Sequence, residues 1–287
     1  MLAARRDAAR REREFALADA LRDEIAALGY AVVDGPSGTE VERIPPPRRL
    51  AEREVDTVLE DPPSVAVTVQ WVVQGWPEDV ARGIASFRRH AGDLDVQHVV
   101  VDAAGSERSH FPDDVEVIAL DRDLGWGGDR AIALRRSRGA VVVLADGSVE
   151  ATGDVLGPLV AALQDPAVGI VGPFGISTDD LREFQEDPGP EVDAIEGYLL
   201  AVRREALLSC GGFDPRFRFY RIGDIDLSFR VRDLRLKALV VPVPVVRHEH
   251  RMWNATPPAE RDAASKRNFN RFLERFRGRT DLIRTSR

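Results

Sequence analysis

The sequence predicts an α/β fold in which a mainly parallel sheet is covered by helices on both faces. From Ser64 onward, short apolar runs alternate with longer stretches of helical pattern. Runs this uniformly apolar are expected of parallel strands that are buried on both sides. Polar residues follow the ends of three of these runs. Ligands of such sheets bind outside the carboxyl ends of the strands, so these polar residues are the first candidates for a site.

The first 44 residues predict a helix followed by a β-hairpin. Leu17, Leu21, Ile25 and Leu28 recur at helical spacing, which predicts one helix over 3–28 that ends at Gly29. Two short strands, 30–34 and 39–44, flank the turn sequence DGPSG. So short a segment buries too little surface for an independent core, so we expect it to dock on another surface or to form a homo-oligomer.

A spacer is expected next. The sequence IPPPRRL is stiffened by three prolines, a short charged helix through Glu60 follows, and the breaker DPP precedes the apolar runs. The expected organisation is a helix-hairpin module at 1–44, a proline-rich linker at 45–62 and the main domain at 63–280.

The main domain predicts five strands and three crossover helices. The strands are expected at 65–73, 96–102, 115–120, 140–146 and 168–173. The helices are expected at 77–90, 126–138 and 154–164.

Composition excludes several classes of protein. No apolar run approaches the ~18 to 20 residues that span a bilayer, and the amino terminus lacks the apolar core of a secretory signal, so we expect a cytoplasmic protein. The single cysteine, Cys210, permits no disulfide within the chain and no thiolate metal cluster, and we expect a buried structural thiol. Only two of the 40 basic residues are lysines, a bias that suggests a GC-rich, bacterial coding genome.

Charge is distributed unevenly along the chain. Residues 261–287 hold nine Lys or Arg and three Asp or Glu, which gives this segment a charge of +6. Because the whole chain has a net charge of -8, the other residues together carry -14. An acidic body argues against DNA as a partner. The basic tail is compatible with contact to an anionic membrane surface, and equally with a solvated helix face.

Three polar residues stand at predicted strand ends. Gln74 follows the first strand, Asp102 ends the second, and Asp146 ends the fourth. A carboxylate at the position of Asp102 can accept hydrogen bonds from a ribose or a base, and it can also cap a turn.

The segment DLGWGGDRAIALRRSRGAVVVLADGSVE, 123–150, carries the first specific resemblance. It is similar to the glycosyltransferase family 2 pattern of spaced glycines and alanines that ends in Asp-x-Asp; the matching positions are Gly125, Gly128, Ala131, Gly139 and Asp146. The resemblance implies a GT-A fold, a Rossmann-type mixed sheet flanked by helices, and a nucleotide-sugar donor bound near Gly125 and Asp146.

The same resemblance implies a divalent metal, Mg²⁺ or Mn²⁺, at the Asp-x-Asp motif. Here the motif reads Asp146-Gly147-Ser148, so its third-position carboxylate is absent. A Ser148 hydroxyl, or a water bound to it, can complete the ligands of an ion that neutralises the donor phosphates. Glu150 is an alternative ligand.

A second resemblance to the family lies in residues 196–250. The matching positions are Gly212, Phe213, Asp214, Tyr220, Asp224, Asp226, Leu227 and Arg230, and Gly223 replaces a usual Glu. The match implies that Asp224 is the general base of an inverting transfer and that Tyr220, Asp226 and Arg230 lie on the acceptor side. The alternative is that Asp224 caps a helix over 225–234.

Two histidines follow the last apolar run in VVRHEHRMW. The resemblance implies that a histidine here joins the metal or contacts the diphosphate, and we assign His248 to the metal. At a spacing of two on a strand, His248 and His250 would face the same way. Arg247 and Arg251 beside them suit a diphosphate.

Near the carboxyl terminus, Phe269, Phe272, Leu273 and Phe276 recur at helical spacing, with Arg267, Arg271 and Arg275 on another face. We expect the aromatic face to pack on the main domain; lying on a membrane surface is the alternative.

The segment REREFALADALRDEIAALGYAVVDGPSGTEVE resembles the small C-terminal helix-hairpin of cysteinyl-tRNA synthetases. That resemblance implies tRNA contact, with docking or self-association as the alternative.

Two functions from different classes follow. The first is a hexosyltransferase-like enzyme that moves a sugar from a nucleotide-diphosphate donor to a hydroxyl acceptor. The second is a non-catalytic scaffold that kept the fold and lost full metal binding, as the Asp146-Gly147-Ser148 sequence allows. A nucleotidyltransferase would need a Gly-rich loop with a Lys after the first strand, and Gln74-Gly75-Trp76-Pro77 has neither.

Overall fold

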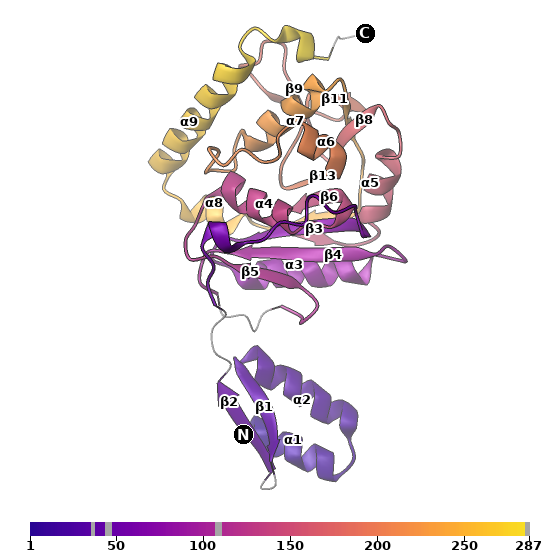
Figure 1. The fold of residues 1–287 in the computed structure, drawn as a ribbon, viewed down its shortest axis with the longest axis vertical. Helices are drawn as coiled ribbons and strands as arrows, with labels where there is room; N and C mark the ends of the chain where they lie inside the picture. Colours follow the sequence, from indigo (N-terminus) through magenta and orange to yellow (C-terminus); the bar gives the residue numbers. More distant parts are fainter. Residues whose placement is uncertain (36–37, 44–47, 107–110, 285–287) are drawn as a thin grey trace. The chain divides into compact units, whose positions relative to one another are not determined.

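The computed structural model describes residues 1–35, 38–43, 48–106 and 111–284. It divides into a small unit, residues 1–48 with 105–114, and a large unit, residues 49–104 with 115–287 (Figure 1).

The small unit is a helical pair with a hairpin. Its elements are α1 (Leu2–Arg11), α2 (Phe15–Ala27), β1 (Tyr30–Gly35) and β2 (Gly38–Arg43). The prediction of one helix over 3–28 is wrong, because the chain turns at Arg13, whose φ is 62°. The turn lets Ala9 of α1 pack against Ala18 and Leu21 of α2.

A buried arginine joins α1 to the hairpin. Arg6 donates hydrogen bonds to Asp34 of β1 at 2.7 Å and to Thr39 of β2 at 2.8 Å. Thr39 in turn donates its backbone N–H to Asp7 of α1 at 3.0 Å. The hydrogen bond from Arg6, opposed by partial burial, lowers the pKa of Asp34 to about 2, so the pair stays charged at neutral pH.

The large unit begins at Arg49, earlier than the expected boundary at 63. Leu50 forms a bridge with Leu120, and Val55 is buried in the core beside Val99 and Ile118. Only a short 3₁₀ helix, η1 (Glu52–Glu54), forms where a longer charged helix was expected. The stretch from 49 to 62 is therefore packed on the large unit, while residues 44–47 of the expected spacer lie outside the described residues.

An eight-stranded sheet forms the centre of the large unit, in the order β11-β14-β8-β13-β6-β3-β4-β5. Its strands are β3 (Val65–Val73), β4 (Val96–Asp102), β5 (Glu116–Ala119), β6 (Gly139–Ala145), β8 (Val168–Gly172), β11 (Glu191–Val192), β13 (Leu199–Arg203) and β14 (Lys237–Val240). Of these, β13 and β11 run antiparallel to their neighbours and the others run parallel. The predicted α/β class with a mixed sheet is confirmed.

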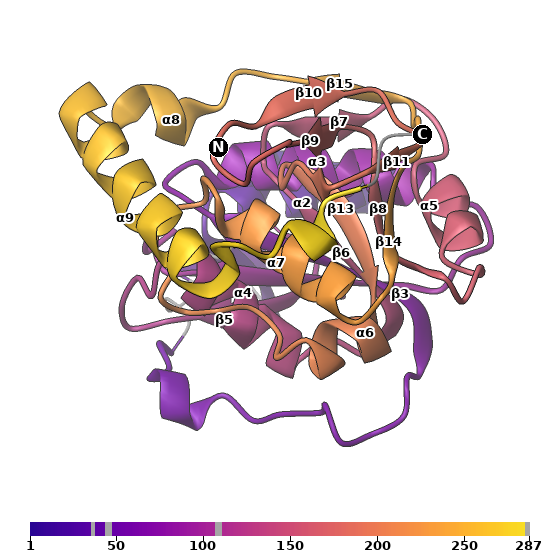
Figure 2. The ribbon, with the colours of Figure 1, turned by 90° about the horizontal axis from the view of Figure 1, so that it is seen from above.

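Helices cover both faces of this sheet (Figure 2). The helices α4 (Trp126–Arg135), α6 (Arg204–Ser209) and α7 (Gly223–Asp233) share one apolar core with the strands. On the other face lies α3 (Pro77–Arg89), where Phe87 meets Trp71 of β3 edge-on at 5.3 Å. The short helix α5 (Leu156–Ala162) packs against β8.

Short strands and the last helices complete the unit. Two further small sheets pair β7 (Val149–Ala151) with β15 (Val245–Arg247), and β9 (Gly175–Ser177) with β10 (Gln185–Asp187) and β12 (Ala194–Ile195). The chain then forms α8 (Arg251–Ala255), α9 (Pro258–Phe276) and η3 (Thr280–Leu282). In the described parts of the chain, no helix is both long and apolar enough to cross a bilayer.

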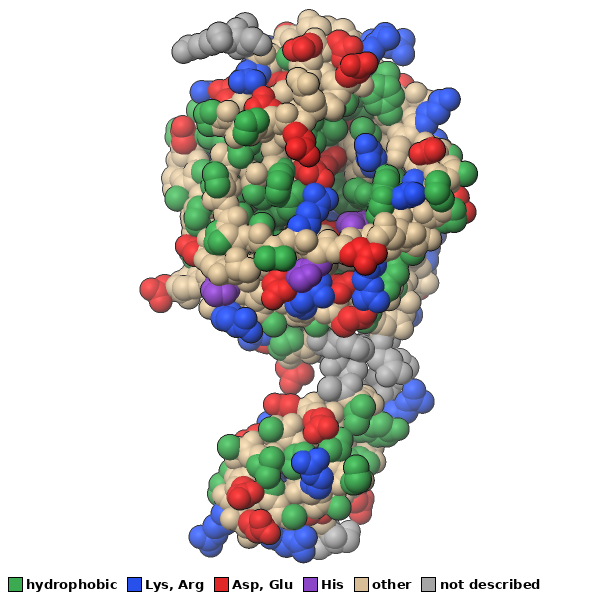
Figure 3. Space-filling model, turned by 180° about the vertical axis from the view of Figure 1, so that it is seen from behind, with side chains coloured by type: hydrophobic (Ala, Val, Ile, Leu, Met, Phe, Trp, Pro, Cys, Tyr) green, Lys and Arg blue, Asp and Glu red, His purple; other side chains and the backbone are tan. Residues whose placement is uncertain are grey.

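The aromatic face of α9 packs on the large unit, as expected. Phe272 and Phe276 are buried against Phe229 of α7, with ring centroids 5.3 Å and 5.6 Å from the Phe229 ring. Arg275 is tied to Asp214 at 2.7 Å, so it does not belong to a free basic face. Figure 3 shows a hollow in one face of the large unit where hydrophobic, basic and acidic side chains meet.

The strand order creates one point where the connections diverge. The chain leaves β3 through α3 to reach β4, on one side of β3, whereas β6 lies on the other side. Loops that follow β3 and β6 therefore separate at their carboxyl ends and leave a crevice between them. In open α/β sheets this switch point is where ligands bind.

Candidate functional site

A small ladder brings two distant segments to the switch point. Residues Val245–Arg247 of β15 pair antiparallel with Val149–Ala151 of β7, and the N–H of His248 donates to the carbonyl of Ser148 at 2.7 Å. This pairing lays the segment after β15 along the loop that follows β6, and so places His250 beside Asp146.

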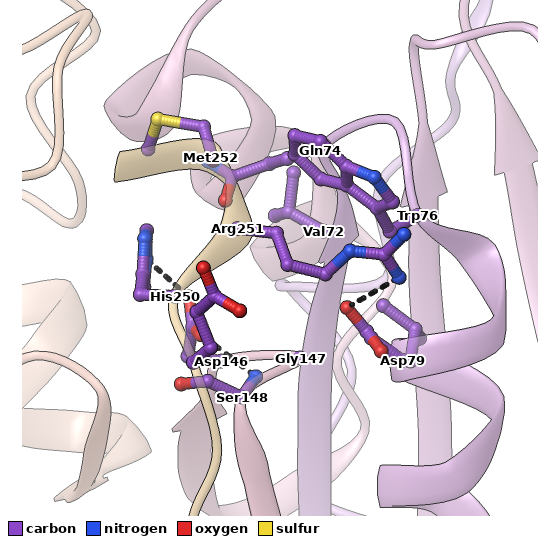
Figure 4. A pocket seen from close by; sticks show the side chains of 12 residues that line it. Val72, Gln74, Trp76, Asp79, Asp146, Gly147, Ser148, His250, Arg251 and Met252 are labelled. Atoms are coloured by element: carbon purple, nitrogen blue, oxygen red, sulfur yellow. Dashed lines mark hydrogen bonds and ion pairs between the residues drawn. The ribbon is translucent and has the colours of Figure 1, made fainter. Parts of the chain in front are cut away.

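Asp146 and His250 are in hydrogen-bond contact on the wall of a small pocket (Figure 4). The Nε2 of His250 lies 3.2 Å from a carboxylate oxygen of Asp146, and the backbone N–H of Ser148 donates to the other oxygen at 2.8 Å. Burial acts to raise the pKa of Asp146, but these two partners outweigh it and lower the pKa to about 2. Asp146 is therefore a permanent negative charge at neutral pH.

The ring of His250 is held from both sides. Its Nδ1 accepts the backbone N–H of Trp253 at 3.0 Å, so His250 caps the start of α8 and its remaining proton lies on Nε2, towards Asp146. Burial acts to lower the pKa of His250, and the hydrogen bond and charge of Asp146 reverse this, so its pKa is raised.

His248, which we assigned to the metal, lies elsewhere. Its Nε2 is 2.7 Å from Glu150, and 39% of its side chain is exposed. The expectation that His248 and His250 face the same way is wrong, because β15 ends at Arg247 and the chain turns into α8 at His250. Glu150 is engaged by His248 and by Arg82 at 3.7 Å, so it does not replace the missing motif carboxylate.

The rest of this pocket comes from the loops after β3 and β6 and the start of α8. Gln74 and Trp76 line it, as the strand-end argument predicted for Gln74. Arg251 crosses towards α3, where it binds Glu78 at 2.6 Å and Asp79 at 3.4 Å (Figure 4). The hydroxyl of Ser148 is buried at the edge of the pocket, and its contact with the Asp146 carboxylate helps to lower the pKa of Asp146.

A buried arginine that the sequence analysis did not single out lies close to Asp146. Arg130 of α4 donates to the carbonyl of Gln70 in β3 at 2.6 Å and to that of Ala145 in β6 at 3.0 Å. Burial lowers its pKa to about 10, with the charge of Asp146 acting in the opposite direction, so Arg130 remains a cation at neutral pH. It joins the two strand ends that frame the pocket.

A larger cavity of about 720 Å³ adjoins the small pocket, and His250 lines both. Asp224 and Tyr220 also line the cavity, and the rings of Tyr220 and His250 are 4.9 Å apart.

Asp224 has the surroundings of a proton acceptor. Its two oxygens accept the backbone N–H groups of Gly197 at 2.7 Å and Ile225 at 2.9 Å. Burial raises its pKa to about 6, against these hydrogen bonds, which act to lower it. The capping position of α7 belongs to Ile222, so Asp224 is not the helix cap of the alternative interpretation.

Asp226 and Arg230, expected on the acceptor side, are instead part of the fold. Asp226 is fully buried and binds Arg230 at 2.8 Å and Arg275 at 2.5 Å. Arg230 also donates to the carbonyls of Cys210 and Gly212. These contacts tie α7 to α9 and to the loop after α6.

Two residues expected at the donor site have structural surroundings as well. Asp102 accepts the N–H of Ala104 at 3.0 Å in a turn, and Arg49 approaches its other oxygen at 4.0 Å. Gly125 begins α4 with a φ of 79°, and a Cβ there would lie 2.7 Å from the backbone of Arg218. Neither residue lines the pocket beside Asp146.

Metal ligands are few at this site. Among the described residues, no group of three or more His, Cys, Asp or Glu side chains is arranged to hold a metal ion. Asp146 and His250 are the two that converge, with the buried hydroxyl of Ser148 beside them.

Comparison with known proteins gives one family and several relatives. Residues 94–225 match the family model described as glycosyl transferase family 2. The N-acetylglucosaminyl-diphospho-decaprenol L-rhamnosyltransferase of Mycobacterium tuberculosis (strain ATCC 25618 / H37Rv) is 28% identical over 254 residues, which cover 82% of this chain and 80% of that protein. The cysteine--tRNA ligase of Caldicellulosiruptor saccharolyticus (strain ATCC 43494 / DSM 8903 / Tp8T 6331) is 51% identical over 43 residues, 15% of this chain and 9% of the ligase.

Two solved structures share the fold. The structure of GalNAc-T7 with UDP, GalNAc and Mn²⁺ superposes with a TM-score of 0.59 at 18% identity, over 75% of this chain and 48% of that one, so this chain spans about half its length. The mannosyltransferase PcManGT from Pyrobaculum calidifontis, in complex with GDP-Man and Mn²⁺, superposes with a TM-score of 0.54 at 18% identity, over 80% of this chain and 73% of that one.

Proposed function

We propose that the chain transfers a sugar from a nucleoside-diphosphate donor to an acceptor hydroxyl, on the premise that residues 94–225 match the glycosyl transferase family 2 model within a fold shared with known glycosyltransferases. The observation that carries the proposal is the pairing of Asp146 with His250 in a pocket that opens beside the cavity of Asp224. A charged donor subsite and a proton-accepting carboxylate then lie on two sides of one imidazole.

The donor diphosphate is proposed to bind beside Asp146, Ser148 and His250, with the nucleoside towards Gln74. The switch point of the sheet favours a ligand there, and a cation held by Asp146 would offset the repulsion between this carboxylate and the donor phosphates. The names of two similar structures, which hold UDP or GDP-Man, support the same class of donor.

The side chains at this pocket fit a divalent cation that shares its ligands with the donor. Asp146 and Nε2 of His250 would be the two protein ligands, and Mg²⁺ commonly takes one or two carboxylates together with substrate phosphates and water. For a neutral His250 to bind through Nε2, its proton would have to move to Nδ1, which would break the hydrogen bond from the Trp253 N–H. Such an ion supplies charge neutralisation for the departing diphosphate. Mn²⁺ in both similar structures supports this proposal.

Asp224 is proposed as the general base. The acceptor oxygen forms a bond to the anomeric carbon as the bond from that carbon to the donor phosphate breaks, and the acceptor proton passes to Asp224. The electron pair leaves with the nucleoside diphosphate. A pKa of about 6 leaves Asp224 ionised at pH 7 and yet basic enough to accept the proton. A single displacement of this kind inverts the anomeric configuration.

One observation favours the second candidate, a scaffold without activity. Ser148 stands in place of a carboxylate, and the described residues hold no three-ligand metal cluster. A scaffold would not require a nucleotide at Asp146.

The melting temperature of the full chain, measured with and without ligands, distinguishes the transferase from the scaffold. At a concentration ten times its Kd, a nucleoside diphosphate stabilises the folded state by about 1.4 kcal/mol, which raises the Tm of a domain of this size by about 3–6 °C. We expect such a rise for UDP, GDP or dTDP with Mn²⁺, a smaller rise with EDTA, and a smaller rise in Asp146→Asn. If none of the three nucleotides moves the Tm of the wild type, the scaffold is the better interpretation.

A further inference from the structure

The cavity beside Asp224 is wide enough for a second substrate. Its volume is about 720 Å³, within the range of sites that hold small molecules. Because Asp224 and Tyr220 lie on its wall, a molecule that places a hydroxyl against Asp224 must extend into this space.

Basic side chains reach the cavity from four separate parts of the fold. Arg182 follows β9, Arg221 precedes α7, Arg247 ends β15, and Lys266 lies on α9. Two glutamates, Glu186 and Glu196, line it as well. The four cations therefore outnumber the three carboxylates of the lining, Asp224 included, although the whole chain carries a net charge of -8.

Three of these cations have no carboxylate within 4.0 Å among the residues that the structure describes, although the charge of Arg182 helps to lower the pKa of the nearby Asp180. Arg247 binds Glu196 at 3.1 Å and lies over the ring of Tyr198 at 4.1 Å, so it is occupied. Arg221 lies 5.6 Å from the ring of Trp253 and makes no ion pair in the described chain. Arg182 and Lys266, both exposed, likewise form no ion pair within the described ranges.

Some exposed cations elsewhere on the large unit do have a carboxylate nearby and so supply a control for the cavity. Arg122, Arg235 and Lys237 each lie within 4.0 Å of a carboxylate, at 3.8 Å, 4.0 Å and 3.4 Å. What distinguishes the cations of the cavity is that they converge on one enclosed space beside Asp224.

Apolar surface lines the same cavity. Ile176, Phe184, Trp253 and Phe269 face it, and the Trp253 ring is flanked by Arg221 and, at 4.2 Å, by Arg261. Aromatic faces bind the rings of sugars and the chains of lipids, whereas a small inorganic anion needs no such wall.

We infer that the acceptor is an alcohol bearing a phosphate or diphosphate group, which Arg182, Arg221 and Lys266 bind while its apolar or ring-shaped part lies against Trp253 and Phe184. Guanidinium groups match phosphate oxygens in pairs, and an ammonium adds a point charge. This inference rests on the proposed function, because it takes the hydroxyl at Asp224 to be the one that reacts.

Binding of defined probes to the full chain tests the inference without knowledge of the natural acceptor. The probes are geranyl diphosphate, glucose 1-phosphate and inorganic pyrophosphate, with geraniol as the uncharged comparison, titrated by calorimetry. The test variant is R182Q/R221Q/K266Q. The matched control, R122Q/R235Q/K237Q, loses the same three charges at paired surface positions.

We expect the wild type and the control to bind geranyl diphosphate or glucose 1-phosphate, and the test variant to bind at least tenfold more weakly. Tighter binding of geranyl diphosphate would indicate a lipid-linked acceptor, and tighter binding of glucose 1-phosphate would indicate a soluble one. Equal affinity in the test variant and control would overturn the inference, as would equal binding of geraniol. Binding of pyrophosphate alone, without either organic probe, would also overturn it.

A second variant, Asp146→Asn, tests the proposed donor site separately from the inferred acceptor site. Asp146→Asn should weaken UDP binding and affect geranyl diphosphate much less than the triple change does, because Asp146 lines the small pocket and not the cavity. If phosphate probes respond to Asp146→Asn and not to the triple change, they occupy the donor pocket and the inference fails. If no nucleotide binds while the triple change still abolishes probe binding, the proposed function fails and the anion site stands.

Discussion

Asp146 is a half-buried carboxyl group and Asp224 is a buried one, and their surroundings shift the two pKa values in opposite directions. Asp146 faces His250 and keeps a pKa of about 2, whereas Asp224 meets two backbone N–H groups and no cation in hydrogen-bond contact, and its pKa rises to about 6. A fixed charge suits the binding of a ligand or ion, and a titrating group suits proton transfer.

Replacing Asp224 by Asn should separate a base from a structural carboxylate. We expect sugar transfer, or donor hydrolysis if no acceptor is known, to fall about 10²- to 10⁴-fold, because an amide cannot accept the proton. The amide keeps only one of the bonds to Gly197 and Ile225, and removal of a buried charge offsets that loss. The Tm should therefore change by less than about 4 °C, which corresponds to about 1 kcal/mol.

The pH profile supplies the control for this variant. Below pH 6 the carboxyl of Asp224 is protonated and unable to act, so the wild-type rate should rise with pH through about 6 and then level off. Residual activity of Asp224→Asn should lack this rise. The folded state favours the protonated form, so the stability that Asp224 contributes is lost as pH increases through about 6. An unchanged profile in the variant would assign the base to another group.

Several site residues could be predicted from the sequence, and the reasons for success and failure are local. Gln74 and Asp146 follow strands that are mainly apolar, so their positions at the sheet edge follow directly. The choice of His248 failed because the end of β15 and the cap of α8 decide which ring turns inward. Asp226 and Arg230 matched a family pattern, but only the fold reveals Arg275 beside them.

At the scale of elements, uniform apolar runs were the dependable signal. The expected strand 65–73 is observed as β3 without change, and the expected 140–146 is displaced by one residue in β6. The helix expected over 3–28 shows the limit of periodicity as a signal. The chain reverses at Arg13, and the helices before and after it pack on each other. The pairing of β7 with β15 joins residues about a hundred positions apart, which no local pattern contains.

Gly125 should be required for the docking of α4 against the segment that ends at Arg218. Its φ of 79° alone costs an alanine about 1–2 kcal/mol, and the clash with the Arg218 backbone adds about 1–3 kcal/mol. Gly211 is the matched control, because its φ is 89° and nothing lies within 4 Å of an added Cβ. Urea unfolding should show a larger loss for Gly125→Ala than for Gly211→Ala. Equal losses would mean that the two segments separate at little cost.

At the scale of the whole chain, the boundary between the two units lies after Arg48. A truncation at this point removes fewer contacts of the large unit than a truncation within the expected linker. Removing residues 1–48 spares Leu50 and Val55, whereas removing 1–60 deletes both from the large unit. The longer deletion also leaves Arg135 and Arg204 without the carbonyls of Glu52 and Val58. These losses remove buried apolar surface and hydrogen bonds together.

We expect the chain without residues 1–48 to melt cooperatively and to keep its nucleotide-dependent rise in Tm. The chain without residues 1–60 should melt several degrees lower, since each unsatisfied buried group costs about 1–3 kcal/mol. Scanning calorimetry of both forms, with and without UDP, checks this. If the shorter deletion already abolishes cooperative melting, the small unit is part of the large unit's core and not a separate module.

His250 is a single side chain shared by two binding spaces, and this has a thermodynamic consequence. A ligand that changes the proton or the orientation of this imidazole from one side changes the free energy of binding on the other. Such coupling is reciprocal: the factor by which a bound donor alters acceptor affinity equals the factor by which a bound acceptor alters donor affinity. An ordered sequence of binding can thus arise from one ring, without a moving loop.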